Sequence, residues 1–328
     1  MTLNVSSMAK LFLPARQRRV CFSNPWNGRL WLNLLEPHNR YGMLFKRNLN
    51  YPKQVLGFTF TSNELGLRGP AKRTAPGVIL GTSFGMGLSV DNGSNWYDLL
   101  LDPDQWFNGS MPVGPRNSAN LLDDQYQGSY DTLIYLYHPN IWKTAQEFVR
   151  AEKLGLDIFQ ALSWKTSLWQ TLLLYPKWIG KESYKTIKGF SVHQKWNTQD
   201  FFFNARYNIM NIPTNSTFAE NQMAILNGIF DKFKLVLAVR VPIKEDLAGR
   251  AGMSDQLRQL AAHYDEWWNF FVSKVGANVR TLELPFDEFD SSDFHPYDTH
   301  WTASGNQKFT RLFRPILTEA SANGVKQG

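Results

Sequence analysis

The sequence has very little cysteine and no long apolar run, and both absences exclude classes of structure. Cys21 is the only cysteine among 328 residues, which excludes an internal disulfide and a cysteine metal site. No apolar stretch is long enough to span a membrane, and no secretory-type hydrophobic region is present. We therefore expect a cytoplasmic protein, with peripheral contact to a membrane surface left open.

Acidic residues are absent from positions 1–35, although five basic residues lie there. The whole chain carries a formal net charge of +7, which suits anionic partners. No dense run of Lys and Arg with interleaved aromatic residues occurs, so nucleic acid is not an expected partner. We interpret the basic segment as solvated, with a transit-like leader or a basic arm as alternatives.

What the chain does contain is a set of short apolar runs separated by helix-like sequence. Its 328 residues, 43% of them hydrophobic, are enough for a large α/β domain. The runs that predict buried strands lie at 77–81, 131–137, 234–241 and 279–284. At 254–275, large apolar residues recur every three or four positions, which predicts an amphipathic helix. This alternation predicts a three-layer α/β/α sandwich with a parallel sheet.

The domain organisation follows from where the strand signals begin and where they are widely spaced. Residues 1–70 show no clean periodicity, and we expect an N-terminal extension that packs on the core. Residues 71–328 form the α/β domain, with an aromatic-rich insertion at about 145–225 near the active site. Its apolar stretch 154–180 is open to three interpretations: a cap over the site, a core helix, or an interfacial membrane helix.

Ser83 is the first candidate for chemistry. It lies in "GVILGTSFGMGLSV" (77–90), where a predicted strand ends among small residues. Ligands of parallel α/β sheets bind beyond the carboxyl ends of the strands, so the position suits a nucleophile. The alternative is an ordinary strand-to-helix turn in which Thr82 or Ser83 caps the helix.

A nucleophilic serine needs a base, and the base needs a third group that orients it. Among the six histidines, we select His300, which has Asp298 two residues before it in "FHPYDTHWTASGNQ", a segment that leads into a helix-like tail. The spacing therefore predicts a triad of Ser83, His300 and Asp298. Convergence of His295, Asp298 and His300 on a metal ion is the alternative, although we expect no metal.

Taken together, "GTSFGMGLSV" and "YDTHWTASGNQ" resemble the nucleophile and histidine blocks of the SGNH (GDSL-like) hydrolases, over about residues 60–315. The upstream "TSNELGLRGP" is similar to a stretch found in exopolysaccharide-associated members. The resemblance implies an oxyanion hole formed by the N–H of Ser83, the N–H of Gly114 and the side chain of Asn140. It also marks a departure, because Thr82 stands where the family has an aspartate.

The function that this resemblance implies is acyl transfer through an acyl-enzyme. We expect a serine-dependent ester hydrolase or acyltransferase acting on O-acetyl groups of a carbohydrate or polysaccharide. The substrate is then a carbohydrate or a small acyl ester; no cofactor is expected, apart from an acyl donor such as acetyl-CoA for a transferase. Thr82, His138 and Trp301 are expected to line the site. The alternatives are a catalytically silent protein that binds a glycan or a partner, and a lipid or thioester hydrolase at a membrane surface.

Overall fold

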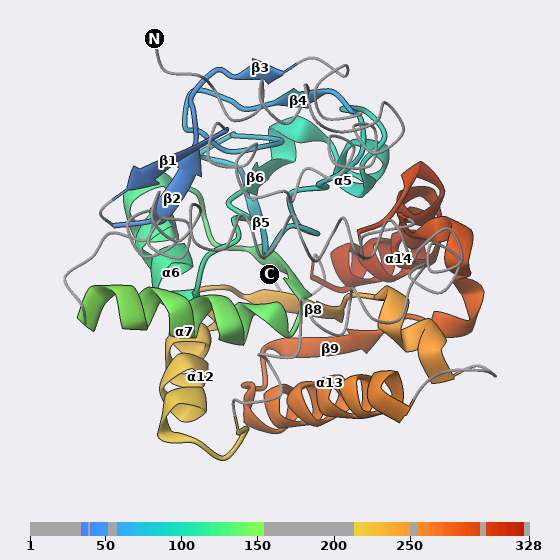
Figure 1. Cartoon of the computed structure of the whole chain (residues 1–328). Coiled ribbons are helices and arrows are strands. Elements are labelled where there is room, and N and C mark those ends of the chain that lie inside the picture. Colours follow the sequence, from blue (N-terminus) through green and yellow to red (C-terminus); the bar gives the residue numbers. More distant parts are fainter. Residues whose placement is uncertain are drawn as a thin grey trace, which may run out of the picture.

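A parallel sheet forms the centre of the molecule (Figure 1). The computed structural model describes residues 34–38, 40–51, 58–153, 213–249, 255–295 and 300–324. Within them the central sheet has five strands in the order β6-β5-β7-β8-β9, and every neighbouring pair is parallel. The strands are β5 (Gly77–Gly81), β6 (Trp106–Asn108), β7 (Thr132–Tyr137), β8 (Leu235–Arg240) and β9 (Val279–Glu283).

The strands form where apolar runs are covered on both faces. All five residues of β5 are buried, and so are the last five of β7 and of β8. Near-continuous apolar sequence is typical of such strands, and the four predicted strands are confirmed within one residue at either end. The strand β6 was not predicted, because three residues with one polar side chain give no periodic signal.

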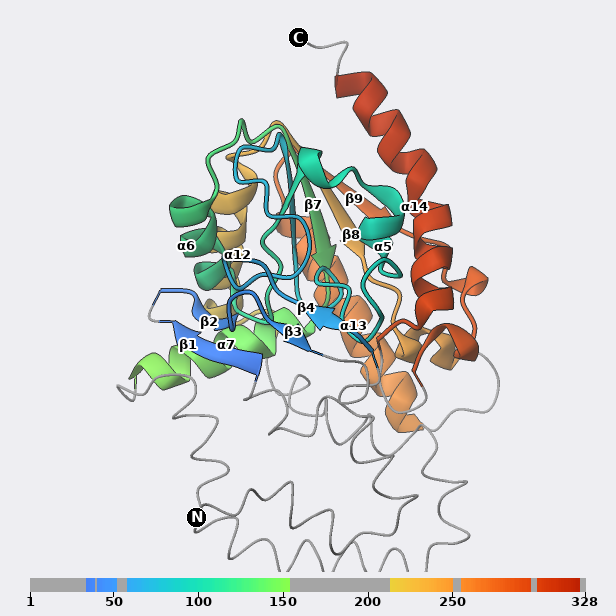
Figure 2. The same ribbon diagram turned by 90° about the horizontal axis from the view of Figure 1, so that it is seen from above.

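Helices cover both faces of the sheet, which confirms the predicted three-layer α/β/α sandwich. Figure 2 shows α6 and α12 on one side of the sheet and α5 and α14 on the other. The rings of Phe230 in α12 and Phe271 in α13 both contact Tyr135 in β7, so α12 and α13 share a face. The helices are α5 (Trp96–Leu100), α6 (Pro115–Gln125), α7 (Asn140–Lys153), α12 (Thr217–Phe230), α13 (Asp255–Lys274) and α14 (Ala303–Gly324). Short 3₁₀ helices are η1 (Pro103–Gln105), η3 (Lys244–Gly249), η4 (Phe286–Glu288) and η5 (Ser291–Asp293).

Short antiparallel strands precede the central sheet. They form two pairs, β1 (Leu35–His38) with β2 (Gly42–Phe45), and β3 (Asn50–Tyr51) with β4 (Phe60–Thr61). Phe45 and Phe60 are fully buried and belong to the main hydrophobic core. Strands of two to four residues are too short to show a period in the sequence, which explains why this region gave no pattern.

The sequence range proposed as an insertion, 145–225, is only partly described. Its two ends belong to α7 and α12, and the stretch 154–180 lies outside the described residues. Among the described helices, none combines the length and the apolar composition that crossing a bilayer requires.

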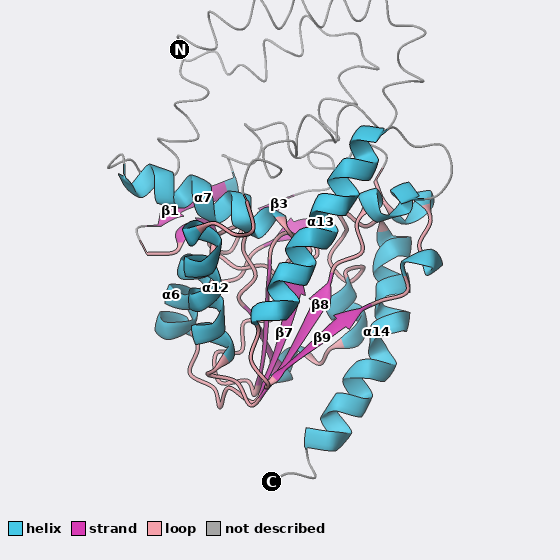
Figure 3. Cartoon of the chain, turned by 90° about the horizontal axis from the view of Figure 1, so that it is seen from below, coloured by secondary structure: helices cyan, strands magenta, loops and turns pink. Residues whose placement is uncertain are grey.

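The strand order gives the sheet a topological switch point between β5 and β7. The chain moves from β5 outward to β6, returns across β5 to β7, and then continues to the other side. At such a switch point the connections leave in opposite directions, and ligands bind outside the carboxyl ends of the two strands. Figure 3 shows the carboxyl ends of β7, β8 and β9 pointing to the same edge of the molecule. Side chains that follow β5 and β7 are therefore the first place to look for a site.

Candidate active site

The segment after β5, which we call the serine turn (residues 82–90), is a tight coil and not a regular helix. The Met86 N–H donates to the Thr82 carbonyl (3.3 Å), and the Leu88 N–H donates to the Ser83 carbonyl (3.1 Å). Gly87 has a positive φ of 60°, and a Cβ there would lie 2.5 Å from the Cβ of Asn95. The positive φ and the close approach of Asn95 thus favour glycine at position 87.

Ser83 and His300 meet although they are 217 positions apart in the sequence. The Oγ of Ser83 and the Nε2 of His300 lie 2.6 Å apart, and both residues are buried. The hydroxyl donates to Nε2 when that nitrogen carries no proton. Thr82 Oγ1 is buried and makes no hydrogen bond within the described part of the chain. Neither side chain therefore caps a helix, which was the alternative interpretation of this segment.

The ring of Phe84 contacts three of the predicted site residues: His138, His300 and Trp301. It stacks on the imidazoles of His138 (centroids 5.2 Å apart) and His300 (4.9 Å), and it meets the edge of Trp301 (5.0 Å). Trp301 is itself buried, and its Nε1 donates to the carbonyl of Pro242 (2.9 Å) in the loop after β8. Trp301 and His138 thus pack around the site through Phe84.

His138 also fixes the start of α7. Its Nδ1 accepts the backbone N–H of Asn140 at 3.0 Å. Because Nδ1 accepts, the neutral imidazole carries its proton on Nε2. Asn140 is the first residue of α7, so His138 sets the place of this predicted oxyanion residue beyond β7.

Gly114 is the N-cap of α6, beyond the carboxyl end of β6. A Cβ at this position would lie 2.9 Å from the Cα of Ala145 in α7, so packing alone requires a glycine. Gly114 and Asn140 both follow strand ends at the edge that carries Ser83. Their assignment to an oxyanion hole stays a prediction.

The segment that carries His300, residues 290–302, is called the histidine loop. The His295 N–H donates to the His300 carbonyl (3.0 Å), and Phe294 forms an isolated β-bridge with Trp301. Asp298 belongs to the stretch 296–299, which lies outside the described residues. Its predicted role of orienting His300 is therefore untested.

Asp293 is a buried carboxylate that sequence reasoning missed. It accepts from the Asp290 N–H (2.9 Å) and the Ser304 hydroxyl (2.8 Å), and it forms an ion pair with Lys308. These contacts anchor the histidine loop to α14. Because the Asp293 carboxylate is bound to these partners, we do not assign it the role of Asp298 in the predicted triad. The signal was the spacing of Asp290 and Asp293, which form a capping box around η5.

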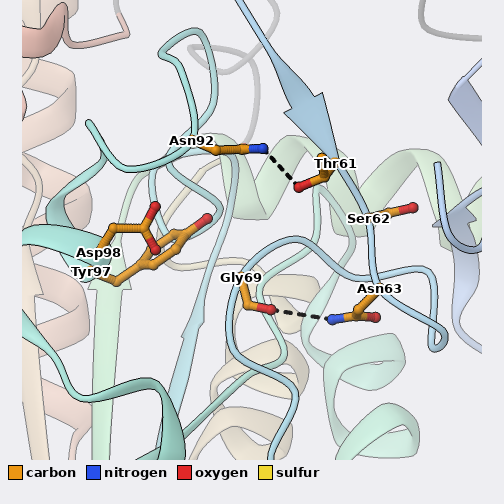
Figure 4. Close-up of a pocket in the computed structure, with 7 residues that line it drawn as sticks. All are labelled: Thr61, Ser62, Asn63, Gly69, Asn92, Tyr97 and Asp98. Carbon is orange, nitrogen blue, oxygen red and sulfur yellow. Dashed lines mark hydrogen bonds between the residues drawn. The ribbon is translucent and has the colours of Figure 1, made fainter. Parts of the chain in front are cut away.

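A small polar pocket of about 210 Å³ lies between the segments 61–69 and 92–98 (Figure 4). Two amide side chains of the pocket form hydrogen bonds within the protein: Asn92 donates to the Thr61 hydroxyl (2.8 Å), and Asn63 donates to the Gly69 carbonyl (3.3 Å). Ser83 and His300 do not line it. We therefore treat this pocket as separate from the serine site.

Within the described ranges, no group of three or more His, Cys, Asp or Glu side chains is arranged to hold a metal ion. The metal alternative from the sequence includes Asp298, which lies outside those ranges. Comparison with known proteins assigns no family: no protein-family model matches the chain, and no curated protein matches it. The function of the chain is therefore inferred from the geometry of the site.

Proposed function

We propose that this protein is a serine-dependent acyl ester hydrolase or acyltransferase that acts on O-acetyl groups of a carbohydrate or polysaccharide. One observation carries the proposal: Ser83 Oγ lies 2.6 Å from His300 Nε2, beside the switch point of a parallel sheet. A hydroxyl with a base within hydrogen-bond reach is the arrangement that nucleophilic catalysis requires.

The first half-reaction begins with attack of Ser83 Oγ on the ester carbonyl carbon, while His300 Nε2 takes the hydroxyl proton. The resulting tetrahedral intermediate carries a negative oxygen. Its collapse breaks the bond to the leaving alcohol, which receives the proton from His300. The products are the free alcohol and an acyl group bound to Ser83.

Two groups of residues support this step in the proposal. Asp298 accepts a hydrogen bond from the Nδ1–H of His300, orients the ring and stabilises the imidazolium. The N–H groups of Ser83 and Gly114 and the amide of Asn140 donate to the negative oxygen. Loss of one such donor typically costs about 3 kcal/mol of transition-state stabilisation.

The second half-reaction decides between hydrolase and transferase. Water attacking the acyl-enzyme releases a free acid, whereas a sugar hydroxyl takes the acyl group as a new ester. In both cases His300 removes the proton from the attacking oxygen and returns it to Ser83. The resemblance to exopolysaccharide-associated members favours a carbohydrate substrate, and acetyl-CoA is the class of donor that a transferase needs.

A serine-directed fluorophosphonate probe tests the nucleophile. We expect labelling of the wild type, loss of the label in Ser83→Ala, and retention in Ser110→Ala. Ser110 is the matched control because it is another buried serine beside the same turn, at Gly85. Well-folded protein that takes no label would contradict the proposal and favour a silent binding protein.

Turnover of an aryl acetate, with and without an oligosaccharide, separates the two outcomes of the second half-reaction. Mass spectrometry of the sugar shows whether it gains an acetyl group. Acetylated sugar indicates a transferase, and release of acetate alone indicates an esterase. Ser83→Ala is the control, because this variant lacks the proposed nucleophile and its rate of aryl acetate hydrolysis gives the background.

A further inference from the structure

Four consecutive backbone carbonyls of the serine turn accept hydrogen bonds from side chains elsewhere in the chain. The bonds are Trp96 Nε1 to Phe84 O (3.0 Å), Asn108 Nδ2 to Gly85 O (2.9 Å), Tyr97 Oη to Met86 O (3.2 Å) and Arg68 Nη1 to Gly87 O. A regular helix would satisfy such carbonyls within itself. Here the fold supplies the donors from β6, α5 and the segment that precedes β5.

Arg68 makes the most extensive of these contacts. Its Nη2 also donates to the Val90 carbonyl (2.6 Å) and to Asn92 Oδ1 (3.1 Å). The side chain is almost fully buried, with its guanidinium 4.9 Å from the centre of the Phe60 ring. The planar guanidinium holds two carbonyls in a fixed geometry, which a lysine does not reproduce. Arg68 is the arginine of "TSNELGLRGP". The proposed mechanism gives this residue no role, and these contacts indicate a structural one.

Tyr97 is a donor that keeps its proton. Burial raises the pKa of its hydroxyl well above the ordinary value. Thr82, by contrast, contributes no side-chain bond in the described part of the chain. The Phe84 carbonyl also accepts the Gly87 N–H at 3.0 Å. A buried carbonyl left without a donor is costly, so removing the side-chain donor to residue 85, 86 or 87 frees the turn to move.

We propose that Arg68, Trp96, Tyr97 and Asn108 are positioning residues that hold the serine turn so that the Ser83 hydroxyl faces His300. This inference rests on the proposed function, since it concerns the reactivity of the same serine. A displacement of the attacking oxygen by about 1 Å can lower a rate by about a hundredfold. The hydrogen bonds of the four side chains reach the carbonyls of residues 84–87, so these side chains act through the backbone of the turn.

Two tyrosine variants test the proposal by removing the same chemical group at different places. Tyr97→Phe deletes the bond to Met86 O, and Tyr126→Phe deletes a bond to the Ala75 carbonyl (2.5 Å) before β5. Both tyrosines are buried. We expect the rate of fluorophosphonate labelling to fall about tenfold in Tyr97→Phe and to stay within about twofold in Tyr126→Phe. With an aryl acetate, kcat should fall in Tyr97→Phe while KM is unchanged.

Hydrogen exchange at residues 84–88 gives a readout that needs no activity. Exchange should be faster in Tyr97→Phe than in Tyr126→Phe, and Arg68→Lys should behave like Tyr97→Phe. Equal labelling rates in the two tyrosine variants, with a labelled wild type, would overturn this inference and leave the proposed function standing. A folded wild type that takes no label would overturn the proposed function together with the effect on reactivity.

Discussion

Ser83 and His300 lie in two segments, the serine turn and the histidine loop, that are stabilised by different kinds of interaction. The carbonyls of the serine turn accept hydrogen bonds from buried side chains, and none of these bonds involves a carboxylate. The histidine loop is anchored by charge, through the Asp293 carboxylate and Lys308, which is also within reach of Asp290. Hydrogen bonds between buried groups respond weakly to pH and salt, whereas the pair of Lys308 with the exposed Asp290 responds to both. We therefore expect changes in pH or salt to weaken the histidine loop and to leave the hydrogen bonds of the serine turn largely unchanged.

The largest expected effect is the loss of activity when Ser83 or His300 is removed. His300→Ala should lower activity by about 10⁴-fold or more, and Ser83→Ala by a similar factor. Because the two side chains act as one unit, the double variant should be no worse than the single variants. Steady-state kinetics of all three with an aryl acetate measures this. Additive losses would show that the two residues do not share a step.

Trp301 is one of the residues through which the two regions touch, and its removal should destabilise the whole protein. It is buried against Phe84 of the serine turn and Phe309 of α14. Trp301→Ala should cost about 3–5 kcal/mol of unfolding free energy. Trp301→Phe keeps much of the packing and loses the bond to the Pro242 carbonyl, so about 1–2 kcal/mol is expected. Urea unfolding gives both values, and equal losses would contradict this division.

Lys308→Met tests the charged anchor of the histidine loop. It leaves the fully buried Asp293 carboxylate without its cation, which should cost about 2–3 kcal/mol of unfolding free energy. The control is Lys234→Met, which removes an exposed lysine that pairs with Asp131 at 2.7 Å. That change should cost less than about 1 kcal/mol. A larger loss in the control would remove the distinction between the two pairs.

The smallest expected effect is the contribution of the histidine loop to the pH dependence of stability. Hydrogen bonds from Ser292, together with Lys308, lower the pKa of Asp290 to about 2. A carboxyl whose pKa is lower in the folded state stabilises the protein above its ordinary pKa, and this stabilisation is lost as the pH falls from about 4 to 2. Asp290 is largely exposed, so the contribution should be below about 1 kcal/mol. Urea unfolding at several acidic pH values should show a shallower decline in Asp290→Asn than in the wild type; identical slopes would assign the acid sensitivity to other groups.

The sequence predicted the parts of this structure that are encoded locally. The strands β5, β7, β8 and β9 were found because each is a short apolar run, and the helix at 254–275 because its apolar residues recur with helical spacing. The strand β6 was missed because its three residues owe their conformation to pairing with β5, which the local sequence does not encode.

The candidate site shows the same division. Ser83 and His300 were found because each lies in a motif with its own spacing, and the structure brings them together. The donors to the serine turn were not found, because Arg68, Trp96 and Asn108 come from separate segments and no local pattern links them to it. Asp293 was missed for a similar reason, since its main cation, Lys308, lies one helix further along the chain.

The chain order of the site has a consequence for how the protein is made. Ser83 follows the first strand of the central sheet, whereas His300 directly precedes the last described helix, α14. That helix then binds back to α5, where Asn306 accepts the Trp96 N–H at 3.0 Å. Proteins are synthesised from the N-terminus, so a nascent chain on the ribosome displays its serine long before the imidazole exists. In the proposed enzyme, the hydroxyl therefore has no base until the segment that carries His300 has emerged and docked against the serine turn.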